Sequence, residues 1–181
     1  MSHAPRYLQY LETPLGKMEI AANEQALTHV IFCGPHIQQA NNSNGITQLA
    51  SLQLTEYFTG TRREFDLPLA PVGTLFQQRV WQLLTAIPFG QSRSYGQLAE
   101  LLQNPKAVRA VGGANGRNPL TIIVPCHRVI GASGKLTGYA GGVERKQWLL
   151  QHEGLTTDCQ FNKSALEAVI QTRQAKTQFL S

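Results

Sequence analysis

The fold of this chain is decided by residues 94–114, which read SYGQLAELLQNPKAVRAVGGA. The opening Ser-x-x-Gln has the spacing of a capping box, in which two side chains satisfy backbone N–H groups at a helix start, and it predicts a helix through Leu102. Asn104 followed by Pro105 is an N-cap with proline at the first helical position, so another helix is predicted to run to about Val111. Two short helices joined by a tight turn favour a helix-turn-helix, a pattern that ordinary helical hairpins share.

Small side chains surround the long cation Arg109 in the later of these helices. With Ala110 and Gly112 beside it, this helix could lie close to a nucleic-acid groove while Arg109 occupies space inside a duplex. The alternative is that the small residues pack one helix on another and Arg109 is a solvated charge.

The chain before this segment predicts an α+β unit. Alternating apolar residues predict short strands at 7–11, 17–21, 27–33 and 64–69, the first three in a meander. Helical spacing predicts helices over 46–58 and 75–87. Pro71-Val72-Gly73 marks a boundary, which gives an N-terminal domain at 1–73, a helical domain at 74–155 and a tail of unreadable role at 156–181.

A cysteine that reads as a nucleophile follows the helix-turn-helix. The apolar run 120–124 predicts a strand that leads to Cys126 and His127, with Arg128 next. The thiolate is the attacking form of cysteine, so a base or a positive charge beside it favours catalysis. The alternative is a small buried hydrophobe, the usual role of a cysteine among apolar residues.

Glu153 lies in the last turn of a helix predicted over 144–153. The negative end of the helix dipole disfavours a carboxylate there, which indicates a specific role. We expect Glu153 to be the partner of His127, the alternative being an ordinary exposed residue. Because neighbouring side chains point in different directions, we expect Cys126 and His127 to communicate through a water.

Basic charge is concentrated in the part of the chain that holds the cysteine. Residues 76–154 carry nine Lys or Arg and three Asp or Glu, whereas residues 1–75 carry four and six. This asymmetry fits a polyanionic partner such as nucleic acid, and it fits a generic basic surface equally well. Three widely spaced cysteines, no apolar leader and no membrane-length apolar run predict a soluble protein of a reducing compartment, with the cytoplasm as the default.

The chain resembles the O6-alkylguanine-DNA alkyltransferases over roughly residues 5–155. The resemblance is carried by the capped Ser-Tyr-Gly-Gln helix, by Arg-Ala-Val-Gly-Gly-Ala at 109–114, by Asn118-Pro119, by Pro-Cys-His-Arg-Val at 125–129 and by Trp-Leu-Leu-x-His-Glu-Gly at 148–154. It implies an α+β fold, with an N-terminal ribonuclease-H-like α/β domain and a C-terminal helical, winged-helix-like DNA-binding domain.

The resemblance also implies an activity. O6-alkylguanine, mainly O6-methylguanine, is flipped out of double-stranded DNA and its alkyl group passes irreversibly to Cys126, in a single turnover without cofactor. O4-methylthymine stays open as a second substrate. The expected protein is a monomer with no obligate protein partner and no membrane association, cytoplasmic or, in a eukaryote, nuclear.

Residue roles follow from the same resemblance. His127 takes the thiol proton through water, Glu153 orients His127, and Tyr95 helps to rotate the nucleotide and protonates the departing guanine. Arg109 fills the gap left by the flipped base, with Ala110, Gly112 and Tyr95 also at the DNA. Asn118 is implied to tie the recognition helix to the active-site turn. The backbone of Cys126 and Val129 is implied to read the guanine edge. The residues implied to line the pocket are Tyr139, Ala140 and Lys146.

The sequence departs from some relatives at two places. Where some carry serine, this chain has Ala140, so only a backbone contact to O6 remains. Asn23 and Thr28 stand where certain relatives bind zinc, and strand alternation places His29, Cys33 and His36 only partly on one face, so we expect no metal.

Three other functions are weighed against this one. A non-enzymatic sensor of alkylated DNA shares the fold but usually has tryptophan in place of the nucleophile, which Cys126 argues against. A Cys-His hydrolase would process many substrate molecules per protein molecule, which distinguishes it from single-use alkyl transfer. A transcription-regulating alkyltransferase is disfavoured because no cysteine-rich domain precedes the catalytic half.

Overall fold

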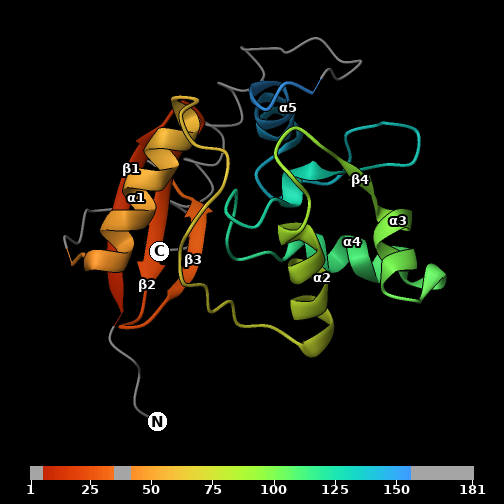
Figure 1. The fold of residues 1–181 in the computed structure, drawn as a ribbon, viewed down its shortest axis with the longest axis horizontal. Helices are drawn as coiled ribbons and strands as arrows, with labels where there is room; N and C mark the ends of the chain where they lie inside the picture. The colour runs from red at the N-terminus through yellow and green to blue at the C-terminus, as the bar shows by residue number, and fades with distance from the viewer. Residues whose placement is uncertain (1–5, 35–41, 156–181) are drawn as a thin grey trace. The chain divides into compact units, whose positions relative to one another are not determined.

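The computed structural model describes residues 6–34 and 42–155. The chain divides into two compact units, the first ending at Pro71 and the second beginning at Val72. Figure 1 shows a sheet with one helix in the first unit and a set of short helices in the second. The unassigned tail at 156–181 lies outside the described residues.

The first unit is built on an antiparallel meander. Its strands are β1 (Tyr7–Thr13), β2 (Gly16–Ala22) and β3 (Leu27–Phe32), in the order β1-β2-β3. The helix α1 (Gly45–Phe58) packs on β1 and β2. Its core joins the sheet and the helix through Met18, Ile20, Leu54 and Tyr57, all fully buried. These elements confirm the predicted meander and its helix.

The predicted strand at 64–69 is wrong. Only one isolated bridge, between Leu27 and Leu69, pairs this segment with the sheet. Leu27 donates to the carbonyl of Pro68 at 2.8 Å and accepts from Ala70 at 2.8 Å. Pro68 and Pro71 have no N–H to donate to a ladder, so the segment cannot continue as a strand.

The second unit is mainly helical. Its elements are α2 (Leu75–Thr85), β4 (Arg93–Ser94), α3 (Tyr95–Leu101), the 3₁₀ helix η1 (Pro105–Ala107), α4 (Val108–Gly116), the 3₁₀ helix η2 (Cys126–Arg128), β5 (Val129–Ile130) and α5 (Val143–His152). The helix α4 packs against α2 and α3. The indole Nε1 of Trp81 in α2 donates to the carbonyl of Ala114 at 2.9 Å, which fixes the end of α4 in the core.

The capping box predicted at Ser94 is present and opens α3. The helix predicted after it differs at both ends, because Asn104 makes no side-chain cap, Pro105 starts a 3₁₀ turn and α4 continues beyond Val111 to Gly116. Packing against two other helices offsets the cost of glycine within α4.

The apolar run 120–124 forms a turn, and the strand predicted there is wrong. The amide of Val124 donates to the carbonyl of Leu120 at 2.8 Å, and Ile122 has a φ of 74°. Leu120, Ile122 and Val124 are buried, so their hydrophobicity reflects burial rather than extension.

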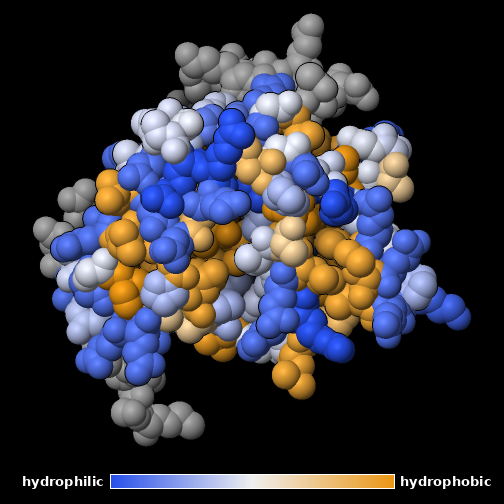
Figure 2. Space-filling model, viewed as in Figure 1, coloured by the Kyte–Doolittle hydropathy of each residue, from blue (hydrophilic) through white to orange (hydrophobic). Residues whose placement is uncertain are grey.

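Apolar side chains also reach the surface of the second unit. Figure 2 shows them around α2 and α3, and the most exposed include Leu75 at 84% and Leu101 at 62%. Leu101 and Val108 flank the turn that joins the two helices of the predicted helix-turn-helix. In the part of the chain that the structure describes, no helix is long and apolar enough to cross a membrane.

Candidate active site

The nucleophile candidate sits at the first residue of η2, directly after the buried turn. Cys126 is 4% exposed and opens η2 after Pro125. The Asn118 amide holds the turn, since its Nδ2 donates to the Val124 carbonyl at 2.7 Å while its Oδ1 accepts from the Leu120 amide at 2.9 Å. The thiol is therefore presented from a rigid, short turn rather than from a strand.

A second asparagine ties α4 to the same turn. Nδ2 of Asn115 donates to the carbonyl oxygen of Cys126 at 3.3 Å. Sequence reasoning missed Asn115, which is 2% exposed. The signal that was available is an asparagine within a small, mainly apolar helix, where its amide needs partners once buried.

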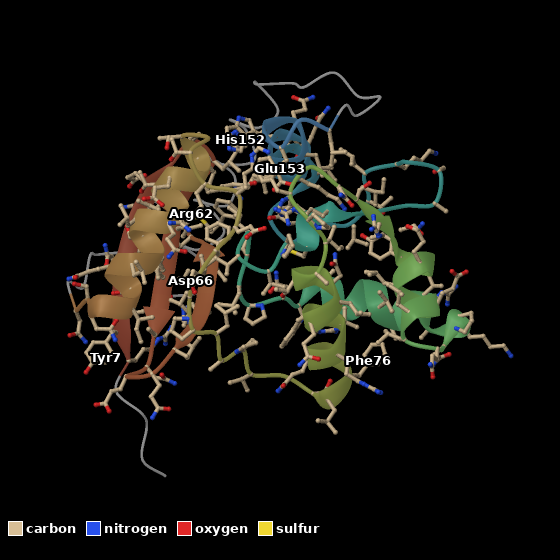
Figure 3. The ribbon with its side chains drawn as sticks, in the orientation of Figure 1. Tyr7, Arg62, Asp66, Phe76, His152 and Glu153 are labelled. Atoms are coloured by element: carbon tan, nitrogen blue, oxygen red, sulfur yellow. The ribbon has the colours of Figure 1, made fainter. Side chains whose placement is uncertain are left out.

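Glu153 is the centre of a buried polar cluster. Its Oε1 lies 2.7 Å from Nε2 of His127, and both side chains are fully buried. Arg128 donates to both carboxylate oxygens, from Nε at 2.8 Å and from Nη2 at 3.0 Å. Figure 3 labels Glu153, which is the C-cap of α5 rather than a residue of its last turn. The helix end that disfavours this carboxylate is thus offset by specific donors.

Arg128 is the residue whose place sequence reasoning missed. It was expected to supply positive charge beside the thiol, but its guanidinium is directed to Glu153 and, through Nη1, to the carbonyl of Ile87 at 2.6 Å. A buried carboxylate beside a neutral histidine needs a cation to balance its charge. The presence of Glu153 therefore indicated that a basic residue such as Arg128 would contact it.

The charges of the cluster follow from its burial and pairing. Burial opposes the ionised form of Glu153, but hydrogen bonds and charges of His127 and Arg128 outweigh it and hold the pKa of Glu153 below its usual range. Burial lowers the pKa of His127 and outweighs the hydrogen bond and charge of Glu153, which raise it, while the positive charges of Arg128 and Lys146 act in the same direction as burial. His127 is therefore neutral at neutral pH, with the proton on Nε2 donated to Glu153 and a lone pair on Nδ1. Nδ1 has no hydrogen-bond partner among the described residues.

The thiol of Cys126 lies in an environment with opposing effects. Burial raises its pKa above the ordinary value, while a hydrogen bond from Asn118 and the positive charge of Lys146 favour the thiolate. A buried thiol of this kind is inert until a base removes its proton.

Tyr95 and Lys146 converge on one carbonyl. The Tyr95 hydroxyl donates to the Thr137 carbonyl at 3.3 Å, and Nζ of Lys146 donates to the same oxygen at 3.0 Å. Nζ also lies 5.9 Å from the centre of the Tyr95 ring. Burial raises the pKa of Tyr95 and lowers that of Lys146 to about 8. The phenol stays protonated at neutral pH and has a cation beside it.

The other residues expected at the pocket lie on the segments around this pair. Tyr139 is buried and Ala140 is exposed in the glycine-rich loop, while the backbone of Val129 pairs in parallel with Arg93. A Cβ on Gly141 would collide with the Tyr139 ring, so glycine is needed there. The β4–β5 pairing was not predicted, because two-residue strands have no periodicity to read.

The residues expected at the DNA lie on α4. Arg109 and Ala110 are exposed, whereas a Cβ on Gly112 would lie 3.9 Å from the Tyr95 ring. The structure thus places Gly112 beside Tyr95, and Arg109 on the outer surface away from the buried cluster.

The residues considered for a metal are otherwise engaged. His29 contacts Glu19 at 2.7 Å and Sγ of Cys33 donates to the Lys17 carbonyl, while His36 lies outside the described residues. Within residues 6–34 and 42–155, no group of three His, Cys, Asp or Glu side chains could hold a metal ion.

Comparison with known proteins covers both units. The 6-O-methylguanine DNA methyltransferase family matches at residues 6–71 with its ribonuclease-like domain and at 75–155 with its DNA binding domain. The methylated-DNA–protein-cysteine methyltransferase of Methanosarcina acetivorans is 48% identical over 82% of this chain and 98% of its own length. The protein of the same name from Mycobacterium tuberculosis is 47% identical over 79% of this chain and 89% of its own length.

Solved structures give the same result. The O6-methylguanine methyltransferase of Mycobacterium tuberculosis superposes with a TM-score of 0.75 at 43% identity, covering 86% of this chain and 97% of that one. A crystal structure of Mycobacterium tuberculosis OGT in complex with DNA superposes with a TM-score of 0.74 at 47% identity, covering 81% and 92%.

Proposed function

The chain belongs to the 6-O-methylguanine DNA methyltransferase family, and on that premise we propose that it repairs DNA by transferring the alkyl group of O6-alkylguanine to its own Cys126. The observation that carries the proposal is the buried thiol of Cys126 next to a histidine whose other side is fixed by Glu153. A neutral imidazole with a lone pair on Nδ1 is the base that such a thiol requires.

The reaction begins with the thiol proton. It passes through a water to Nδ1 of His127, and the resulting imidazolium is stabilised by the Glu153 carboxylate at Nε2. Arg128 keeps Glu153 ionised and aligned while this charge develops. Asn118 and Lys146 stabilise the thiolate that remains.

Transfer is a displacement at the alkyl carbon. The sulfur–carbon bond forms as the carbon–O6 bond breaks, and the bonding electrons move onto the guanine. Tyr95, kept protonated by burial, donates its proton to the leaving base, and the ammonium of Lys146 beside its ring stabilises the phenolate. The thioether has no leaving group for water to displace easily, so each molecule acts once.

DNA enters the proposal through α4 and Tyr95. Base flipping is needed because O6 cannot be reached inside the stack. Arg109, exposed on α4, fills the gap in the duplex, and Ala110 and Gly112 allow the helix and Tyr95 to approach the strand. In the pocket, the Val129 backbone reads the guanine edge and Tyr139 with the Ala140 backbone lies near O6.

Other parts of the proposal concern the state of the protein. The hydrogen bonds of the cluster are complete within one chain, so the proposed reaction needs no residue from a second copy, and a monomer is proposed. Three widely spaced cysteines are not the pattern of a disulfide-rich secreted domain, which supports a reducing compartment such as the cytoplasm. The domain limits at 1–73 and 74–155 remain proposed.

The direct test is the mass of the Cys126 peptide after incubation with duplex DNA that contains O6-methylguanine. We expect one added methyl group on Cys126 and none on Cys33, whose replacement by alanine leaves the yield unchanged. An unmodified Cys126 peptide would contradict alkyl transfer and favour a lesion sensor. Release of product by catalytic amounts of protein from an ester or peptide would favour a hydrolase.

The DNA role of Arg109 predicts a difference between two substrates. Arg109→Ala should slow repair in duplex DNA by about tenfold or more, because only a duplex has a gap to fill, and should leave the reaction with free O6-benzylguanine almost unchanged. The control is Lys106→Ala, which removes a cation of η1 and should reduce mainly the salt dependence of binding. Equal losses on both substrates would argue against insertion into the duplex.

A further inference from the structure

A polar hollow of about 460 Å³ lies against the paired strands β4 and β5. One side of it is formed by Ser92, Arg93, Ser94 and Gln97, and the other by the start of the glycine-rich loop, which includes Gly131 and Gly134. Among the described residues that line the hollow, none is acidic, and Arg93 carries a positive charge. The hollow is therefore suited to an anion.

Hydrogen bonds fix both walls of the hollow. Ser94 and Gln97 form the capping box that opens α3, so their side-chain oxygens are used by the helix. In the opposite wall, the amide of Gly131 donates to the Lys135 carbonyl at 3.0 Å, and the amide of Gly134 donates to the Gly131 carbonyl at 2.9 Å. The loop is a closed turn here, and the hollow needs no ligand to form.

Arg93 has hydrogen-bond donors to spare. Its side chain is half-buried, and its Nη1 donates to the carbonyl of the preceding Ser92 at 2.9 Å. A guanidinium has five N–H donors in a planar fork. Within residues 6–34 and 42–155, no carboxylate pairs with Arg93, whereas Arg128 is held by Glu153. The free edge of such a fork matches the oxygens of a phosphate.

The hollow borders the place where the flipped base is expected. Arg93 and Ser94 pair with Val129 and Ile130, and Ser94 directly precedes Tyr95. Figure 1 shows β4 leading straight into α3. A flipped nucleotide rotates about its backbone but stays joined to its neighbours. The phosphates that flank the lesion must therefore pass close to Tyr95 and Val129, which is next to the hollow.

We infer that the hollow is a phosphate subsite, in which Arg93 binds one backbone phosphate of the lesion strand beside the flipped nucleotide. The inference rests on the proposed function and extends it from the base to the strand. Arg109 fills the gap in the duplex, whereas Arg93 holds the strand that carries the lesion. Because the subsite contacts no base, it adds affinity without sequence preference.

The consequence is a difference between two forms of DNA. A single strand has no gap to fill, but it has the same phosphates beside the lesion. Loss of Arg93 should therefore affect transfer from single-stranded and duplex DNA alike, whereas loss of Arg109 should affect the duplex. Free O6-benzylguanine has no phosphate, so its reaction should not depend on Arg93.

The experiment measures single-turnover methyl transfer at subsaturating concentrations of single-stranded or duplex DNA that contains O6-methylguanine, over a range of salt concentrations. Arg93→Gln removes the charge and keeps most of the side-chain length. We expect transfer from both forms to slow by about tenfold. The slope of log rate against log salt should become shallower by about 0.9 on duplex and about 0.7 on single strands. Arg93→Lys should keep the slope and lose only part of the rate.

A neutral phosphate identifies the contact itself. A methylphosphonate replaces, one at a time, each phosphate that flanks the lesion. At one position it should slow the unchanged protein by about tenfold and Arg93→Gln hardly at all, because both changes remove the same interaction. The control is Arg6→Gln, which removes a 60% exposed arginine of the first unit and should leave the salt slope and the methylphosphonate pattern unchanged.

Two results would overturn the phosphate subsite. One is a set of methylphosphonate losses, or a salt slope, that is the same in Arg93→Gln as in the unchanged protein. The other is a loss confined to duplex DNA, which would assign Arg93 to the gap and not to the lesion strand. No methylation of Cys126 in the unchanged protein by either form of DNA would instead overturn the proposed function.

Discussion

A histidine–glutamate pair occurs in each unit, and the two pairs have the same contact geometry in different surroundings. His29 and Glu19 in the first unit, and His127 and Glu153 in the second, each join Nε2 to Oε1 at 2.7 Å. The first pair is 20% and 14% exposed, whereas the second is fully buried. The same contact is therefore partly exposed to solvent in the first unit and shielded from solvent in the second.

An arginine completes both groups and shows the same contrast. Arg6 reaches Glu19 at 3.4 Å with its side chain 60% exposed, and Arg128 reaches Glu153 at 2.8 Å with 7% exposed. Exposed ion pairs contribute little because water competes for them. A buried group has no such competitor, so removing one member leaves an uncompensated charge. Burial, and a thiol at the next residue, are what turn the same three side chain types into a candidate catalytic group.

The largest difference between the two groups is expected when the glutamate of each is replaced by glutamine. Glu153→Gln leaves the buried Arg128 without its counter-charge, and we expect a loss of about 3–5 kcal/mol in the free energy of unfolding. Methyl transfer by the molecules that remain folded should fall by about a hundredfold or more, because His127 loses the charge that stabilises its imidazolium. Urea titration and single-turnover kinetics measure the two effects.

The matched change in the first unit is Glu19→Gln. It should cost about 1 kcal/mol or less and leave transfer unchanged, because its partners are partly solvated. A loss in Glu19→Gln as large as that in Glu153→Gln would show that burial is not what distinguishes the groups.

A smaller effect is expected when the arginines are replaced with charge retained. Arg128→Lys keeps the cation but loses the two-pronged contact with Glu153 and the bond to the Ile87 carbonyl. We expect a loss of about 1–3 kcal/mol in the free energy of unfolding by thermal or urea titration. Arg6→Lys, at an exposed position, should change it by only about 0.5 kcal/mol. Equal effects would mean that the fork geometry at Glu153 contributes nothing.

The features that could be read from the sequence are local ones. The capping box at Ser94 depends on residues three apart, and the meander depends on alternation within each strand, so both are written in short stretches. Glu153 could be singled out because a carboxylate at a helix end is anomalous by itself. The tight turn at 120–124 was misread because complete burial and extension leave the same apolar run.

The features that could not be read depend on chain segments meeting in space. Arg128 and Asn115 acquire their roles from Glu153 and from the Cys126 carbonyl, which no spacing along the chain announces. The parallel pairing of Arg93 with Val129 is likewise set by packing between segments. Burial of individual polar residues could not be predicted, because the residue type is the same whether the side chain is exposed to solvent or buried in the core.

The free energy of unfolding should fall at acid pH because of the buried pair His127 and Glu153. The pKa of folded His127 lies below its ordinary value of about 6.5, so the unfolded chain binds a proton that the folded chain resists. Stability from this group is complete above about pH 6.5 and is lost as the pH falls, by at most about 1.4 kcal/mol per pH unit for one proton. The pKa of Glu153 is also lowered, which adds a further loss below about pH 4.5.

Urea titrations between pH 5 and 8 isolate the contribution of the histidine: His127→Gln should flatten the curve of stability against pH below pH 6.5. The control Trp81→Phe removes a buried hydrogen bond but no titrating group, so it should lower the whole curve without changing its slope. An unchanged slope in His127→Gln would mean that the pKa of His127 is the same in the folded and the unfolded chain, which would contradict a buried imidazole that is held neutral.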